Sequence, residues 1–167
     1  KKSKKQKVKL TASVESREQL TALLKVDEIE SLYLGYEIFE PKLLGRQVPE
    51  LIQQLSSMGK QIYLALPHVV REGELDKLQP YLKQFVSDGL SGYLVRNLES
   101  FGILKKHNLE SYAVLDHSIY TMNDQAQLFW KEQGACKDTA SLEQNDRELM
   151  RRCNESSEMI AYGYLPM

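Results

Sequence analysis

The chain has 167 residues, of which 42% are hydrophobic and 27% charged, and its formal net charge is −1. This composition is typical of a soluble globular protein that buries one core. No apolar run approaches the roughly 18 residues that span a bilayer, which excludes a membrane protein. The basic start leads into amphipathic sequence and not into an apolar leader, so we expect a cytoplasmic location.

Residues 1–7 form a basic tail that contains five lysines. Such a tail can contact nucleic acid or a membrane, or it can be a solvated linker. We expect a tail or linker without a binding role, because no matching basic run follows it. Residues 8–167 are then a single domain. Since the sequence starts without Met, we expect this domain to be a fragment of a longer protein.

Strand-like apolar runs alternate with amphipathic, helix-like segments along the rest of the chain. The expected strands cover residues 8–14, 31–35, 61–66, 92–95, 111–115 and 159–164, with a weaker one near 136–141. The expected helices cover residues 17–25, 49–58, 74–86, 98–106, 123–133 and 145–153. This alternation predicts a parallel sheet covered by helices.

The expected helices have ordinary start and stop residues. Ser16 is a good N-cap for the first helix, and Pro49 suits the first turn of the second, where a missing N–H costs nothing. Seven strands and six helices are one strand short of a closed (β/α)8 barrel. The predicted fold class is therefore α/β, a TIM-barrel-like (β/α) parallel barrel that is incomplete, with about seven strands.

Polar residues follow the ends of these strands. In a parallel barrel the carboxyl ends of the strands lie at one end of the molecule, and ligands bind there. We therefore predict one ligand-binding cluster. Its members are Glu15, Glu37, His68, Arg71, Arg96, Asp116, Glu143 and Tyr162. The sequence assigns no catalytic residue among them.

Arg96 has two interpretations. A guanidinium at the end of an apolar strand can bind a carboxylate or phosphate through two parallel hydrogen bonds. Alternatively, Arg96 forms a structural ion pair with a neighbouring carboxylate. The histidines are equally open: His68 and His117 either bind a ligand or are hydrogen-bonded residues at strand ends. No H-E-x-x-H helix is present, which excludes a zincin. His68, His107 and His117 could in principle join Asp116 or Glu143 around a metal, but we predict no metal site.

Short strings in this chain, taken in order, resemble one known family. They are VESREQL at residues 14–20, LALPHVVR at 64–71, GYLVRNL at 92–98, DHS at 116–118 with Asn123, SLE at 141–143 and YGYLPM at 162–167. Together they resemble peptidase family U32, the collagenase-like proteases, and in particular the C-terminal barrel-like region of its long members. The resemblance implies a TIM-barrel-type fold and a hydrolase that acts on peptides.

Other members of that family look like iron–sulfur proteins that hydroxylate RNA bases or quinone precursors. Those carry clustered cysteines, whereas this chain has only Cys136 and Cys153. A [4Fe–4S] cluster normally needs four thiolates. We therefore expect no cofactor within this fragment, and a metal or iron–sulfur cluster only in the parent protein.

Three functions remain open. The first is a domain of a U32-type peptidase that is inactive as an isolated fragment. The second is a non-catalytic accessory domain that binds RNA, a peptide or a partner domain. The third is part of an iron–sulfur-dependent RNA-modifying hydroxylase. The expected partners are other domains of the parent chain, a peptide or RNA substrate, and a second copy in a homodimer, but no membrane.

Overall fold

Seven parallel strands form the centre of the molecule. The computed structural model describes residues 8–71, 73–152 and 154–163, so the predicted tail at residues 1–7 lies outside the described residues. The strands pair in sequence order, and every neighbouring pair is parallel. They are β1 Leu10–Val14, β2 Ile29–Gly35, β3 Gln61–Ala65, β4 Gly92–Val95, β5 Ala113–Leu115, β6 Lys137–Thr139 and β7 Ser157–Glu158.

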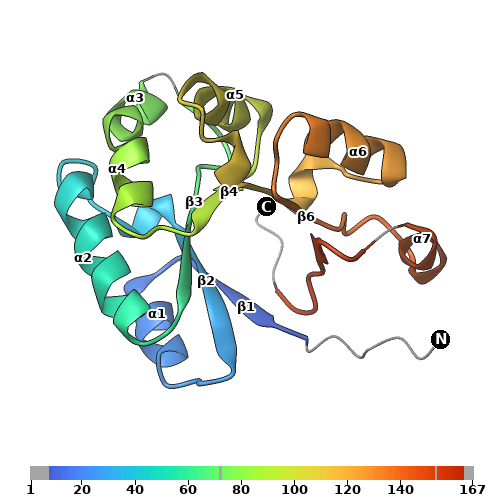
Figure 1. The fold of residues 1–167 in the computed structure, drawn as a ribbon. Coiled ribbons are helices and arrows are strands. Elements are labelled where there is room, and N and C mark those ends of the chain that lie inside the picture. The colour runs from blue at the N-terminus through green and yellow to red at the C-terminus, as the bar shows by residue number, and fades with distance from the viewer. Residues whose placement is uncertain (1–7, 72, 153, 164–167) are drawn as a thin grey trace.

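Helices fill the connections between the strands and lie on the outer side of the curled sheet (Figure 1). They are α1 Arg17–Leu23, α2 Leu44–Ser57, α3 Glu74–Leu78, α4 Leu82–Ser87, α5 Leu98–Lys106, α6 Asp124–Glu132 and α7 Asp146–Arg151. The 3-10 turns are η1 Tyr36–Ile38, η2 Gln79–Tyr81, η3 Glu110–Tyr112 and η4 His117–Ile119. The predicted α/β parallel barrel-like fold, incomplete, is confirmed. Across the described ranges, every helix is too short or too polar to cross a lipid bilayer.

The strands place alternate residues on two faces, and each face has its own apolar layer. The larger layer lies between sheet and helices and includes Leu32 and Leu34 of β2. The smaller layer lines the inner face of the half-barrel. It contains Tyr33, Tyr63, Ala65, Leu94 and Val114. Burial on both faces explains why these strands read as continuous apolar runs.

Two predicted helices that contain a proline differ from the structure. The helix predicted over residues 49–58 begins at Leu44, so Pro49 lies in its second turn and not in its first. The helix predicted over residues 74–86 is divided into α3 and α4 by the turn η2, which contains Pro80. Proline has no N–H to donate to the carbonyl four residues earlier, which accounts for the break.

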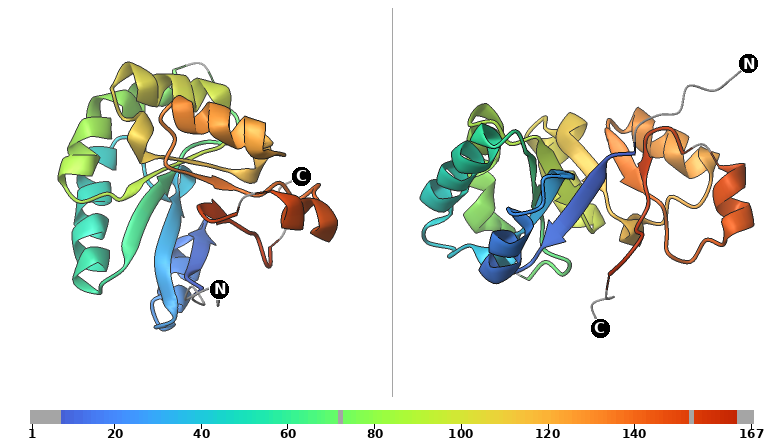
Figure 2. Two further views of the ribbon diagram at one scale, coloured as in Figure 1. Left: turned by 45° about the vertical axis from the view of Figure 1, so that its right-hand side comes forward. Right: turned by 90° about the horizontal axis from the view of Figure 1, so that it is seen from below.

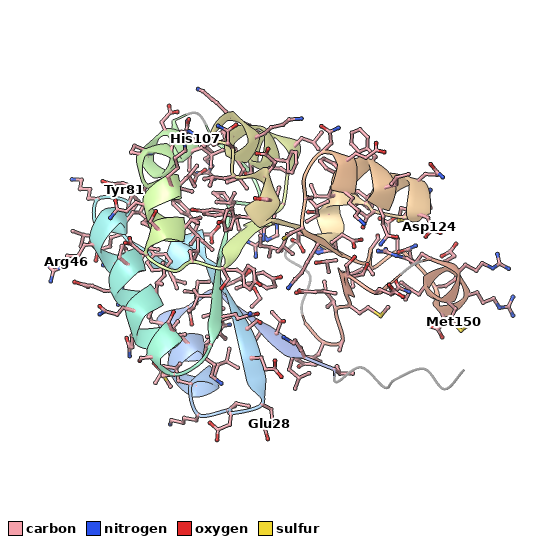
Figure 3. All side chains as sticks on the ribbon, viewed as in Figure 1. Glu28, Arg46, Tyr81, His107, Asp124 and Met150 are labelled. Carbon is pink, nitrogen blue, oxygen red and sulfur yellow. The ribbon has the colours of Figure 1, made fainter. Side chains whose placement is uncertain are left out.

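The turn η2 still packs closely on α2. A β-carbon added to Gly45 of α2 would stand 2.5 Å from the Tyr81 ring, and Figure 3 shows Tyr81 beside that helix. Only a glycine therefore permits this close approach.

The last predicted strand is wrong. The structure has β7 at Ser157–Glu158, and the described residues 159–163 are not in a strand. Met159 and Ile160 are 53% and 41% exposed, so their apolar character did not mark a buried strand. Residue 164 of the predicted strand lies outside the described residues.

The half-barrel has two edges, because β1 and β7 are the ends of the strand order. Figure 2 shows the curled sheet with α1 to α5 along its convex side, and with α6 and α7 grouped near β6. An edge strand presents unpaired backbone groups that another chain can use.

A buried polar cluster replaces the apolar layer behind β6 and β7. α6 has no fully buried residue. Instead, the Arg152 guanidinium pairs with the Asp138 carboxylate, and their side chains are 2% and 8% exposed. Ser157 donates its hydroxyl to Asp138 at 2.6 Å, and Arg152 also donates to the carbonyl oxygen of Thr121 at 2.7 Å. This cluster joins β6, β7 and the loop before α6.

We expect Arg152→Met to lower the free energy of unfolding by about 3–5 kcal/mol, because it leaves the Asp138 carboxylate buried without its cation. Arg151→Met is the matched control, since Arg151 is exposed on the last turn of α7, and it should change stability by less than about 0.5 kcal/mol. Urea denaturation measures both. Equal small losses would contradict the importance of the cluster.

Candidate functional site

Five of the predicted site residues follow five consecutive strands at their carboxyl ends. They are Glu15 after β1, Glu37 after β2, His68 after β3, Arg96 after β4 and Asp116 after β5. Because the strands are parallel and neighbours, these residues lie along one edge of the sheet. Each of these residues lies in the turn or loop after its strand and not within the hydrogen-bonded part of the sheet.

Arg96 is the centre of this group. Its side chain is 4% exposed, with Nε 3.6 Å from Asp116 Oδ2 and Nη2 3.8 Å from Glu15 Oε1. Both distances suit an ion pair but exceed a hydrogen bond. Nε and Nη1 are buried and have no hydrogen-bond partner among the described residues. The guanidinium is therefore close to two carboxylates but incompletely bound by them.

Asp116 is shared between Arg96 and His117. Its Oδ1 accepts from the backbone N–H of His117 at 2.8 Å and lies 2.9 Å from the Nδ1 atom of the same residue. This contact forms in the 3-10 turn η4, for which Asp116 is the N-cap. A carboxylate on Nδ1 fixes the orientation of the imidazole and leaves Nε2 as the free ring nitrogen.

His68 is half-buried in the loop after β3. Burial lowers the pKa of His68, and the nearby Arg96 cation lowers it further, although Asp116, Glu15 and Glu37 act in the opposite direction. Asn97 holds this loop by donating its side-chain N–H to the carbonyl oxygens of Pro67 at 2.9 Å and His68 at 3.3 Å. His68 therefore lies within electrostatic range of Arg96, Asp116, Glu15 and Glu37.

Gly35 leaves room for the acidic side of the site. A β-carbon at Gly35 would lie 3.1 Å from Glu37 Oε2, 3.1 Å from the Val14 carbonyl oxygen and 3.6 Å from the Glu15 α-carbon. The Glu37 carboxylate therefore lies over the end of β2, beside the backbone that bears Glu15. A larger residue at position 35 would push these acids apart.

The other predicted site residues lie further along their loops. Arg71 is exposed after β3, and its backbone N–H donates to Glu74 at 3.1 Å. Glu143 is exposed before α7, and its N–H donates to the Ser141 hydroxyl at 3.3 Å. Tyr162 is 87% exposed beyond β7. Their membership of the site stays a prediction.

His117 was not in the predicted cluster, although its contact with Asp116 makes it part of the site. Its position directly after Asp116 was the available indication. Metal binding has no support within the described ranges, where no three His, Cys, Asp or Glu side chains are grouped to hold an ion.

An α/β barrel-like protein with polar side chains gathered at the carboxyl ends of its strands is the class that the fold and the site define. Within this class, the model of the family described as peptidase family U32 matches residues 16–165. The chain therefore belongs to peptidase family U32. No curated protein matches its sequence.

The lowered pKa of His68 predicts how stability depends on pH. In the unfolded chain His68 has its usual pKa of about 6.5, whereas in the folded chain its pKa is lower. As the pH falls from about 6.5 to the folded pKa, the unfolded chain takes up a proton on His68 more readily than the folded chain does. The free energy of unfolding therefore decreases over this pH range. We expect His68→Gln to reduce this loss, as measured by thermal melts from about pH 5 to 7. An unchanged pH dependence in His68→Gln would contradict the environment described for His68.

Proposed function

We propose that this chain is the substrate-binding barrel of a U32-type collagenase-like peptidase. The peptide binds at the carboxyl ends of β1 to β5, where Arg96, Asp116, His117 and His68 are gathered. The parent protein acts as the hydrolase in the cytoplasm. The observation that carries this proposal is the buried Arg96 guanidinium, two of whose donor atoms have no hydrogen-bond partner among the described residues.

A substrate oxygen would complete the hydrogen bonding of Arg96. A buried donor without a partner costs about 1–3 kcal/mol, and more when the group is charged. The nearest carboxylates, at 3.6 and 3.8 Å, are too distant to accept from it. A carbonyl or carboxylate oxygen of a peptide is an acceptor that Arg96 can bind, and a carbonyl bound in this way is polarised toward attack by water.

The Asp116–His117 pair provides the base for such an attack. With Nδ1 held by Asp116, the Nε2 atom of His117 is the position that can accept a proton from water. Ser118 is not the nucleophile, because its hydroxyl donates to the Arg96 carbonyl oxygen at 2.9 Å. The described residues contain no group of three His, Cys, Asp or Glu side chains that could hold a metal ion. We expect the isolated chain to bind peptide with little or no turnover, because the remaining catalytic groups would come from the rest of the parent protein.

RNA binding has less support than peptide binding. The site places the carboxylates of Glu15 and Asp116 beside one buried guanidinium, with Glu37 at the next strand end, and phosphate groups are repelled by that excess of negative charge. An iron–sulfur-dependent hydroxylase would need thiolates in addition to Cys136 and Cys153. The open edges at β1 and β7 suit another domain of the parent chain or a second copy as partner.

Binding of tetraglycine, followed by calorimetry, tests the role of Arg96. We expect Arg96→Met to weaken binding by about 10- to 100-fold, because the variant keeps an unbranched apolar stem but removes every donor. Arg151→Met is the control, since Arg151 is exposed on the last turn of α7 and is not a member of the predicted cluster, and it should bind like the wild type.

A second outcome would support the structural interpretation of Arg96. If the wild type binds no tetraglycine and Arg96→Met loses about 3–5 kcal/mol of stability, Arg96 is an ion-pair residue of the fold. Urea denaturation of the same variant separates these cases.

A further inference from the structure

The charges at the site do not balance. Asp116 is buried, and both of its oxygens are committed, one to His117 and the other facing Arg96. One carboxylate and one guanidinium offset each other. Glu15 and Glu37 then remain as excess negative charge beside the group. The Glu15 side chain is 60% exposed and Glu37 is exposed, so both reach the solvent from which a ligand arrives.

The two remaining acids follow the neighbouring strands β1 and β2. A β-carbon at Gly35 would lie 3.1 Å from Glu37 Oε2 and 3.6 Å from the Glu15 α-carbon, so the Glu37 carboxylate lies close to the backbone that carries Glu15. Glu15 Oε1 lies 3.8 Å from Arg96 Nη2, which places a negative and a positive group side by side. The unpartnered Nη1 of the buried Arg96 belongs to the same guanidinium.

We infer that the site recognises the free amino end of a peptide, with its α-ammonium group between Glu15 and Glu37 and the adjoining carbonyl oxygen on Arg96. This inference rests on the proposed function and specifies its substrate class as peptides with an unblocked amino end. An α-ammonium group has three donors and no acceptor, which suits two carboxylates. The ammonium nitrogen and carbonyl oxygen of one residue lie about 3 Å apart, a spacing that fits neighbouring acidic and basic groups.

Other ligands fit these charges less well. A free carboxylate on Arg96 would approach Glu15 and meet repulsion, and a phosphate carries still more negative charge. A divalent cation lacks a set of three ligating side chains within the described ranges. A ligand that carries a cation next to an acceptor oxygen satisfies both halves of the site.

Three probes separate the amino end from the carboxyl end in calorimetric titrations of the whole chain. They are tetraglycine, tetraglycinamide and N-acetyltetraglycine. We expect tetraglycine and tetraglycinamide to bind with similar affinity, because both have the α-ammonium group. Acetylation removes that charge and should weaken binding at least about tenfold, as expected for loss of a charged hydrogen bond.

Variants of the acids test the placement of the ammonium group. Glu15→Gln and Glu37→Gln should each weaken the binding of tetraglycinamide by about tenfold. Neither variant should weaken the binding of N-acetyltetraglycine. Glu40→Gln is the matched control, because Glu40 is an exposed acid three residues after Glu37, and it should bind like the wild type. All three acids are exposed, so each variant is expected to fold.

The outcomes distinguish this inference from the proposed function. If tetraglycine binds through Arg96 but N-acetyltetraglycine binds equally well, recognition of the amino end is wrong and the peptide site stands. If tetraglycine does not bind at all, the proposed function and the inference both fail. If Glu40→Gln weakens tetraglycinamide as much as Glu15→Gln does, the effect is one of general charge and the assigned position of the ammonium group is wrong.

Discussion

A hydrogen bond across the inner face of the half-barrel connects β2 with β7, two strands that do not pair with each other in the sheet. The hydroxyl of Tyr33 on β2 donates to Glu158 on β7 at 2.9 Å, although these strands are not neighbours in the sheet. Lys137 of β6 lies 3.7 Å from the same carboxylate and 3.4 Å from the Tyr63 hydroxyl. Burial raises the pKa of Tyr33 far above its ordinary value, so it remains a donor. Burial lowers the pKa of Lys137, but Tyr63 and Glu158 outweigh that effect and raise it, so Lys137 remains a cation. These contacts connect β6 and β7 to β2 and β3 across the inner face of the half-barrel.

The sequence predicts those parts of the fold that depend on local patterns. The apolar runs of β3 and β4 are buried on both faces, so their composition alone identified them. The two polar residues of β6 made that strand uncertain, and the structure explains them separately: Lys137 faces inward to Glu158, and Asp138 faces outward to Arg152. Glu158 and Arg152 are distant from β6 in the sequence, and no local pattern identifies them as its partners. The same long-range contacts make β7 a strand of two polar residues, which no apolar pattern can indicate.

The position of a residue relative to a strand end decided how well the site could be predicted. Arg96 and Asp116 directly follow β4 and β5, and the parallel register brings them together. Glu143 comes four residues after β6, where the course of the loop and not the strand determines its place. The burial of Arg96 depends on side chains from several elements, so a sequence shows the residue type but not the missing hydrogen bonds. The pairing of His117 with Asp116 likewise depends on a 3-10 turn that local composition does not specify.

The energetic cost of Arg96 links the fold to the proposed function. A long apolar side chain at the end of β4 would bury its atoms without desolvating a charge. Arg96 instead buries two donor atoms that find no partner in the part of the chain that the structure describes. Asp116 does not remove this cost, because one of its oxygens is held by His117 and the other stays beyond hydrogen-bond distance from Nε. A fold optimised for stability alone would bring that carboxylate into a bidentate pair with the guanidinium. Residues that lower stability in this way are typical of binding sites, where the missing partner is supplied by the ligand. In the proposed function, a substrate oxygen would supply the partner that Nε and Nη1 lack among the described residues.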